Sequence, residues 1–412
     1  MKKPEVLIPA SSLEVLQTAV MFGADAVYIG GDAYGLRAGA HNFSKEEMSE
    51  GIAFAHAHDT RVYVTANIFA HNEDLAGIRE YFHELKEVKP DALIISDPGV
   101  FTLAREICPE IEVHVSTQAN NTNYEIYNFW HRLGAQRVVS ARELSLKEIR
   151  EIRDHIPEDL EIETFVHGAM CISYSGRCLL SAFMTGRDAN QGACTHPCRW
   201  KYALVEEKRP GEYWPVDETD RGTYIFNSKD LCMIEYIPEL VAAGIDSFKV
   251  EGRMKTALYV ATTARTYRLA VDDYFIDPEL YRSRIPWYKE QIAACTYRQF
   301  TTGFFFQKPD QNTQIYDANT YTKGYTYLGL VEEISEIGEV CIHQRNKFSV
   351  GEVIEVMQPS GKNVEVTVEA IYDVEGNSME SAPHPKQELR VRLLLPEGEQ
   401  VAPYDVLRRK EG

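Results

Sequence analysis

The 412-residue sequence has no apolar run approaching the roughly 20 residues that a helix needs to cross a bilayer. Its first residues, MKKPEVLIPASS, include two lysines but no apolar core long enough for a signal peptide. Both absences predict a cytoplasmic protein without a membrane partner. Because thiols stay reduced in the cytoplasm, we expect the eight cysteines to be metal ligands or buried thiols rather than disulfides.

Positive charge is also scarce. The chain has 43 Lys and Arg residues against 62 Asp and Glu residues, which gives a formal net charge of −19. Non-specific binding of nucleic acid depends on clustered Lys and Arg, so this balance argues against a protein that coats DNA or RNA. It leaves open a local basic patch that contacts one RNA.

Two hydrolase motifs are missing as well. The chain contains neither HExxH, which binds zinc in metallopeptidases, nor GxSxG, which presents a nucleophilic serine. A peptidase would therefore depend on Cys171 as the nucleophile, with His167 as its base. That arrangement would give no role to three other cysteines close by in the sequence.

The sequence does contain a regular alternation of short apolar runs and amphipathic stretches between residue 5 and about residue 274. Runs that are apolar throughout are typical of strands buried on both faces of a parallel sheet. Eight alternations favour a closed (β/α)8 TIM-like barrel over an open sheet. The eight runs begin at Glu5, Asp25, Arg61, Asp91, Ile111, Gln136, Glu161 and Asp246.

Helix start and stop signals support this alternation. S-x-x-E spacing, which is typical of a capping box, occurs at Ser11, Ser44 and Ser145. Glycines that follow a helical stretch and precede a strand suit a left-handed helix end, and they are Gly23, Gly134 and Gly244.

The domain organisation follows from these patterns. We predict a TIM-like barrel over residues 1–285, a linker over 286–325, and a small C-terminal antiparallel β-barrel domain over 326–412. A cysteine-rich insertion at about 168–225 interrupts the barrel after its seventh strand. Because barrel enzymes place their sites at the carboxyl ends of the strands, this insertion is expected to be functional.

Four cysteines lie within this insertion, at Cys171, Cys178, Cys194 and Cys198. Thiolates are ligands of both iron–sulfur clusters and structural zinc. Zinc sites usually use closely spaced pairs on both sides, whereas here the first two cysteines are seven positions apart, so the spacing favours a cluster without excluding zinc. Cys232, where a helix is expected to begin, is a rival fourth ligand.

The insertion is locally basic. Between residues 165 and 201 it carries Arg177, Arg187, Arg199 and Lys201 against the single acid Asp188. This charge could compensate a thiolate-ligated cluster or bind an anionic substrate, since Arg offers a planar fork to carboxylate and phosphate. A solvated loop surface is the simpler alternative.

The stretch from Glu163 to Ser181, ETFVHGAMCISYSGRCLLS, meets every fixed position of the motif E-x-F-x-x-G-S/A-L/M-C-x4-G-x-C-x-(L/I/V/M)-S. This motif defines the peptidase U-32 family, and the segments GRDANQGACTHPCRWKY and SFKVEGRMK extend the likeness. The chain resembles this family over essentially its whole length.

The resemblance implies a cysteine-bound [4Fe–4S] cluster held by Cys171, Cys178 and Cys194, with Cys198 favoured over Cys232 as the fourth ligand. Within the family the chain most resembles the branch that forms 5-hydroxyuridine at the wobble position of tRNA. That branch works without molecular oxygen, with prephenate as the hydroxyl source. Other members hydroxylate ribosomal RNA or a quinone precursor, and an older assignment describes collagenase-like peptidases. The implied partners are tRNA, a small dicarboxylate and iron–sulfur assembly proteins.

Polar residues at the strand ends supply the remaining candidates. Prephenate carries two carboxylates, so Arg142 and Arg253 are predicted to bind it, with Arg187 and Arg199 of the insertion as further substrate-binding residues. His167, Glu251 and Arg253 are the catalytic candidates. Two structural alternatives stay open: a Glu251–Arg253 ion pair, and a buried, hydrogen-bonded histidine.

Overall fold

The computed structural model describes residues 2–31, 34–35, 42–171, 174–175, 177–205, 213–215, 223–224, 229–295, 298–306 and 324–411. Within these residues, none of the helices combines the length and the apolar character that crossing a bilayer requires.

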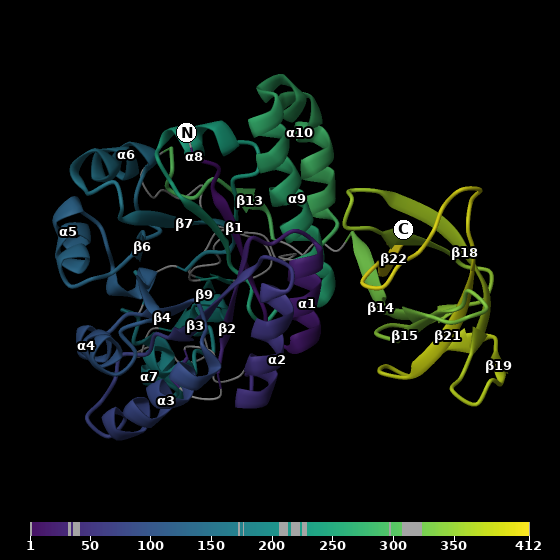
Figure 1. Ribbon diagram of the computed structural model, residues 1–412, viewed down its shortest axis with the longest axis horizontal. Helices are drawn as coiled ribbons and strands as arrows, with labels where there is room; N and C mark the ends of the chain where they lie inside the picture. Colours follow the sequence, from purple (N-terminus) through teal and green to yellow (C-terminus); the bar gives the residue numbers. More distant parts are fainter. Residues whose placement is uncertain are drawn as a thin grey trace.

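Eight parallel strands form a closed barrel at the centre of the larger domain (Figure 1). Each strand pairs with the next, and the last pairs with both the first and the seventh, which closes the ring. The predicted (β/α)8 barrel is therefore confirmed. Its strands are β1 (Glu5–Pro9), β2 (Ala26–Gly30), β3 (Arg61–Ala66), β4 (Ala92–Ile95), β5 (Glu112–Val115), β6 (Arg137–Val139), β7 (Glu161–Ala169) and β12 (Ser247–Val250).

Helices surround the barrel and bury their apolar faces against the outer side of the strands (Figure 1). They are α1 (Leu13–Met21), α2 (Lys45–His56), α3 (Leu75–Val88), α4 (Pro98–Ile107), α5 (Tyr124–Arg132), α6 (Leu146–His155), α8 (Ile237–Ala242), α9 (Ala257–Ile276) and α10 (Pro278–Ala293). Both predicted capping boxes at Ser44 and Ser145 are present. The cap of α1 is Ser12, not Ser11, because Ser12 is the residue whose side chain accepts from Val15 N.

The barrel interior contains a network of buried charges. Arg137 on β6 is buried and donates to Glu5 Oε1 at 2.6 Å, to Glu161 Oε2 at 2.6 Å and to Glu163 Oε2 at 3.0 Å. Lys249 on β12 donates to Glu163 Oε1 at 2.6 Å. Although burial opposes ionisation of Glu163, the two cations hold the pKa of its carboxyl below the ordinary value. Four strands are thus joined by charges inside the ring.

The cysteine-rich insertion leaves the barrel after β7. Its elements are α7 (Leu180–Thr185), the short helices η2 (Ala189–Gln191) and η3 (Pro197–Arg199), and the strands β8 (Lys201–Val205), β9 (Tyr213–Pro215) and β10 (Thr223–Tyr224). The chain returns through β11 (Asp230–Cys232), which pairs antiparallel with β7 and parallel with β13 (Phe300–Thr301). The helix expected to begin near Cys232 is preceded by this strand and starts only at Ile237.

The predicted linker differs from the structure at its start. Residues 286–293 form the end of α10, where Tyr288 and Ile292 are buried in the barrel's core although Pro286 lies inside the helix. Apolar packing against α9 therefore continues the helix past the proline. Residues 307–323 lie outside the described residues.

The C-terminal domain is a closed antiparallel barrel, as predicted. Its ring runs β17–β22–β14–β15–β21–β18 and closes through a β17–β18 pairing. These strands are β14 (Tyr325–Ile334), β15 (Val340–His343), β17 (Val353–Met357), β18 (Asn363–Tyr372), β21 (Glu388–Leu394) and β22 (Val406–Lys410), with the short strands β16 (Phe348–Ser349), β19 (Ser378–Met379) and β20 (Ser381–Ala382) beside them.

The two domains meet through buried polar contacts. Arg265 on α9 donates to the carbonyl of Gln358 at 2.9 Å and to Gln291 Oε1 at 2.7 Å. Burial and the nearby Arg408 lower the pKa of Arg265 to about 9. On the α1 side, Glu14 pairs with Arg345 of the C-terminal domain. Figure 1 shows this domain standing beside α9, α10 and α1.

We predict that Gly168→Ala destabilises the barrel more than Gly186→Ala. Both glycines have positive φ, at +104° and +70°. A Cβ on Gly168 would lie 2.4 Å from the carbonyl oxygen of Glu251, whereas one on Gly186 meets nothing within 4 Å. Overpacking should add about 1–3 kcal/mol to the left-handed penalty that both variants share. Thermal unfolding followed by circular dichroism measures the difference, and equal shifts in the midpoint would contradict it.

Candidate functional site

A cavity of about 480 Å³ lies at the carboxyl end of the barrel strands. Its wall is built from residues that follow the strands, including Asn67 after β3, Ser116 after β5, Arg142 in the loop after β6 and Glu251 after β12. The insertion covers one side, with Leu180 and Ser181 of α7 facing inward. Barrel enzymes place their sites at this end, so the cavity is the candidate site.

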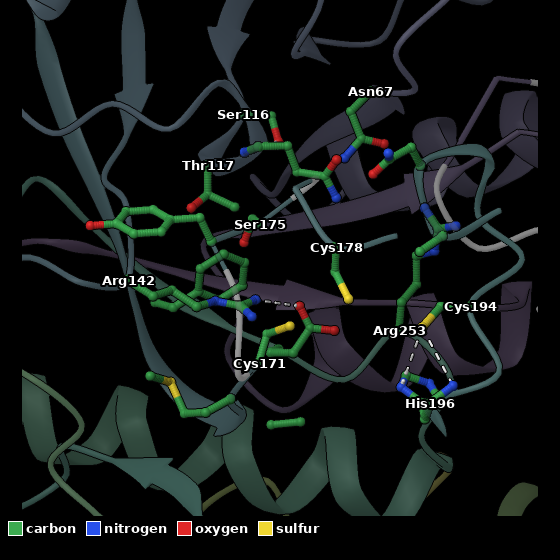
Figure 2. Close-up of a pocket in the computed structure, with 18 of the residues that line it drawn as sticks. Asn67, Ser116, Thr117, Arg142, Cys171, Ser175, Cys178, Cys194, His196 and Arg253 are labelled. Carbon is green, nitrogen blue, oxygen red and sulfur yellow. Dashed lines mark hydrogen bonds and ion pairs between the residues drawn. The ribbon is translucent and has the colours of Figure 1, made fainter. Parts of the chain in front are cut away.

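All four cysteines of the insertion line this one cavity. Figure 2 shows the side chains of Cys171, Cys178 and Cys194 around its centre, with Arg142 on one side and Arg253 on the other. Cys171 is exposed, and the other three, Cys198 included, are partly buried. The fold thus brings together side chains that are up to 27 positions apart in the sequence.

Contacts with barrel loops fix the insertion over the cavity. Asn120 Nδ2 donates to the carbonyl of Ser175 at 3.1 Å, which ties the insertion to the loop after β5. Gln191 Nε2 donates to the carbonyl of Phe69 at 3.0 Å, and the Arg177 guanidinium lies 5.4 Å from the centre of the Phe69 ring. These contacts set the position of the cysteines relative to the strand ends.

Cys194 has a polar neighbour that sequence reasoning missed. The backbone N–H of His196 donates to Cys194 Sγ at 3.4 Å, and His196 Nδ1 lies 3.8 Å from the same sulfur (Figure 2). His196 has a φ of 54°, a left-handed conformation that turns the chain back toward Cys194. The two contacts direct the backbone N–H and a ring nitrogen of His196 toward the sulfur of Cys194.

Cys232 is placed differently. It ends β11, opposite His167 of β7, and it is not among the residues that line the cavity. Burial raises the pKa of its thiol to about 11, which keeps it protonated. Cys108 and Cys295 are buried, as expected, whereas Cys341 in β15 is only partly buried because it lies on the outer wall of the C-terminal barrel.

The four cysteines all line one cavity. Among the described residues, no three His, Cys, Asp or Glu side chains lie close enough together to hold a single metal ion. Tetrahedral zinc requires such convergence. In a [4Fe–4S] cluster each thiolate binds a different iron, so its ligands stand around the group. Four thiol donors on one cavity are the kind of ligand set that a [4Fe–4S] cluster uses.

The cavity is rich in cations. Among the described residues that line it, the four cations Arg142, Lys249, Arg253 and Lys255 face one carboxylate, that of Glu251. Arg142 Nη2 donates to Glu251 Oε2 at 3.1 Å, and its guanidinium lies 4.1 Å from the centre of the Phe165 ring. This arrangement can attract a small polyanion.

Arg253 and Lys249 reach the cavity from β12 and from the loop that follows it. Arg253 is buried, and its Nη1 donates to Thr65 Oγ1 at 2.7 Å. A Cβ on Gly30 would lie 2.6 Å from Arg253 Nη1, so this glycine leaves room for the guanidinium. Sequence reasoning missed Lys249, although a lysine between the buried Phe248 and Val250 is a signal of an inward-facing charge.

The structure separates His167 from the other catalytic candidates. The register of β7 against β12 shifts, so that Phe165 pairs with Lys249 but His167 pairs with Val250. Phe165 and Lys249 line the cavity, whereas His167 packs against Tyr259, Tyr267 and Phe300. The bulge thus turns His167 toward α9. Its surroundings are those of a buried histidine, which was the structural alternative for this residue.

Arg187, one of the two predicted substrate-binding arginines of the insertion, is not among the residues that line the cavity. Arg187 is exposed, and its carbonyl accepts from Ser181 Oγ at 2.7 Å. The side chain of Arg199 lies outside the described residues, although its backbone belongs to η3. Their substrate-binding role stays a prediction.

We predict that His167 makes folding stability fall as the pH drops from about 6.5 to about 4. Burial lowers the pKa of His167 to about 4, whereas an unfolded histidine titrates near 6.5. Between these pH values the unfolded chain binds a proton at this histidine and the folded chain does not. The free energy of unfolding therefore falls by roughly 3 kcal/mol over this range. Denaturant unfolding at several pH values measures this slope. His167→Phe should flatten it, and an unchanged slope in that variant would contradict the assignment.

Comparison with known proteins places the chain among relatives. Residues 11–315 match Peptidase family U32, and residues 323–408 match the Peptidase family U32 C-terminal domain.

The chain is 41% identical to "tRNA hydroxylation protein P1" of Bacillus subtilis (strain 168), over 99% of this chain and 95% of that protein. It is 38% identical to "tRNA hydroxylation protein P" of Escherichia coli (strain K12), over 93% and 92%. A 23S rRNA 5-hydroxycytidine synthase of the same E. coli strain is 37% identical over 65% of this chain and 39% of its own length. The chain therefore belongs to peptidase family U32.

Proposed function

We propose that this protein is an RNA-hydroxylating enzyme that forms 5-hydroxyuridine at the wobble position of tRNA. The names of three relatives, two tRNA hydroxylation proteins and a 5-hydroxycytidine synthase, support hydroxylation of an RNA pyrimidine. The observation that carries the proposal is one cavity that holds four cysteines and an excess of cations at the mouth of the barrel.

The cofactor we propose is a [4Fe–4S] cluster bound by Cys171, Cys178, Cys194 and Cys198. The cavity that the four cysteines share supports this ligand set, as does the placement of Cys232 elsewhere. When bound, such a cluster supplies one-electron redox chemistry or a Lewis-acidic iron. His196 would donate its backbone N–H to the Cys194 thiolate, and iron–sulfur assembly proteins would deliver the cluster.

The co-substrate we propose is prephenate, which carries two carboxylates. Arg142, Lys249 and Arg253 would provide the cations that bind them, since each lines the cavity. Glu251 holds the Arg142 guanidinium at 3.1 Å and would fix its direction. The buried Glu163 would do the same for Lys249 from below. These residues would bind and orient the dianion beside the cysteines.

A peptidase receives less support from the geometry. A cysteine nucleophile at Cys171 would need His167 as its base, but His167 lies on the α9 side of β7 and not among the residues that line the cavity. Its lowered pKa also makes it a poor base near neutral pH.

Replacing any one of the four cysteines should remove the cluster. We expect wild-type protein purified without oxygen to be brown and to contain about four irons per chain. Cys171→Ser, Cys178→Ser, Cys194→Ser and Cys198→Ser should each lose most of the visible absorption, iron and sulfide. Cys341→Ser is the matched control, because this cysteine lies in the C-terminal domain.

Colourless wild-type protein with stoichiometric zinc would refute the cluster. If the cluster is present, nucleoside analysis of tRNA from a strain that lacks the gene tests the activity. We expect this tRNA to lack 5-hydroxyuridine. Expression of the wild-type chain should restore the nucleoside, whereas expression of Cys171→Ser should not.

Removing Arg142 should weaken the binding of the dicarboxylate. A charge-assisted hydrogen bond contributes about 1.5–3 kcal/mol, so Arg142→Gln should raise the KM for prephenate roughly 10- to 100-fold. Arg150→Gln, an exposed arginine on α6 that pairs with Asp154, is the matched control. Iron content should be normal in both variants. A KM that does not change in Arg142→Gln would exclude this residue from the binding of the co-substrate.

A further inference from the structure

Exposed apolar side chains of the insertion, together with Met254 after β12, lie on or next to segments that line the cavity, and we name this set the rim. Phe183 is the most prominent, with 88% of its surface exposed. Tyr174 and Met254 are both exposed and also line the cavity, so the rim is continuous with it. The rim consists of Tyr174, Leu179, Phe183, Met184, Trp200 and Met254.

The short helix α7 has an inverted arrangement of polar and apolar residues. Ser181 is buried, and its hydroxyl donates to the carbonyl of Arg187 at 2.7 Å and accepts from the N–H of Thr195 at 3.1 Å. Thr185 Oγ1 donates to the carbonyl of Ser181 at 2.8 Å. The hydroxyls therefore face inward while Phe183 and Met184 face solvent. Large exposed apolar groups on a helix that buries its polar ones indicate a binding surface.

The charge around the rim selects an anionic partner. Arg177 and Arg187 are exposed on the same segment. Its single acid, Asp188, is engaged at the start of η2, where Oδ1 accepts from the N–H of Asn190 at 2.8 Å. The chain as a whole has a net charge of −19, so this locally basic segment favours a polyanion against the overall charge.

Aromatic groups beside arginines suit the unpaired bases of RNA, because bases stack on aromatic faces while arginines contact phosphates. A base inside a duplex cannot reach a cavity enclosed by barrel loops, so the target nucleotide must leave its stack. Its neighbours then need a surface that replaces the lost stacking. Tyr174 and Met254 of the rim line the cavity, so the rim adjoins the place where those neighbours would lie.

We propose that the rim is a stacking platform for the unpaired bases that flank the target nucleotide of a single-stranded RNA loop. In this arrangement Phe183, Tyr174 and Trp200 stack on bases, while Arg177 and Arg187 contact the backbone. The inference rests on the proposed RNA-hydroxylating function and adds the surface that recognises the unpaired bases of the substrate.

The experiment measures the binding of two fluorescently labelled RNAs to the intact, cluster-loaded protein by fluorescence anisotropy. One RNA is a hairpin with an unpaired, uridine-containing loop, and the other is a fully paired duplex of the same composition. Wild-type protein should prefer the hairpin. Phe183→Ala should weaken hairpin binding roughly tenfold or more, as expected for one lost stacking contact, whereas Phe183→Tyr should keep the affinity. Ile276→Ala, at the exposed end of α9, is the matched control.

Salt dependence separates stacking from charge. Phe183→Ala should leave the slope of log affinity against log salt unchanged, whereas Arg187→Glu should reduce the slope by about 1 or more. The visible spectrum of each variant should match the wild type, because both side chains are exposed.

Three outcomes would overturn the inference. If the wild type binds the hairpin and Phe183→Ala binds equally well, the platform is wrong and the proposed function stands. If the wild type binds neither RNA, the proposed function fails together with the inference. If Phe183 is instead required for binding to vesicles of phosphatidylglycerol and phosphatidylcholine, with no effect on RNA, the rim is a lipid-binding surface.

Discussion

The charges inside the barrel are the constraint on which the site depends. Arg137 is buried and holds carboxylates from β1 and β7, and Glu163 of β7 in turn holds Lys249 of β12. An uncompensated buried charge costs about 3–5 kcal/mol, so each strand must present its residue at the correct register and on the inner face. Lys249, which belongs to the same network, also lines the cavity. The alignment of the strand ends, and thus the geometry of the mouth, follows from these pairings.

Most of the fold could be predicted because its signals are local. Strands buried on both faces appear as short apolar runs, and all eight barrel strands were found in this way. The capping boxes at Ser44 and Ser145 are likewise local. The strand β11 was missed because its three residues, Asp230–Cys232, gain their conformation from pairing with β7 and β13, which lie far away in the sequence. The end of α10 was missed because apolar burial outweighs the local effect of Pro286.

Some residues of the candidate site could be predicted from the sequence, and others could not. The spacing of the cysteines and the family motif pointed to the four residues that line the cavity, and strand ends pointed to Arg142, Glu251 and Arg253. Sequence could not show which way His167 faces, because a register shift between β7 and β12 reverses the alternation at that point. His196 was also out of reach, since its contact with Cys194 depends on a left-handed backbone conformation.

The joint between the two domains has a mechanical consequence. Arg265 of α9 and the fully buried Arg408 of β22 share Gln291 of α10 as an acceptor, and Glu14 of α1 reaches Arg345 on the other domain. A movement of one domain against the other would leave these guanidinium groups buried without hydrogen-bond acceptors. Burying a charge without a partner costs free energy, so such a movement is unfavourable. These contacts therefore hold the C-terminal barrel in one orientation relative to the larger domain. Any movement of one domain relative to the other must therefore break this set of hydrogen bonds and ion pairs together.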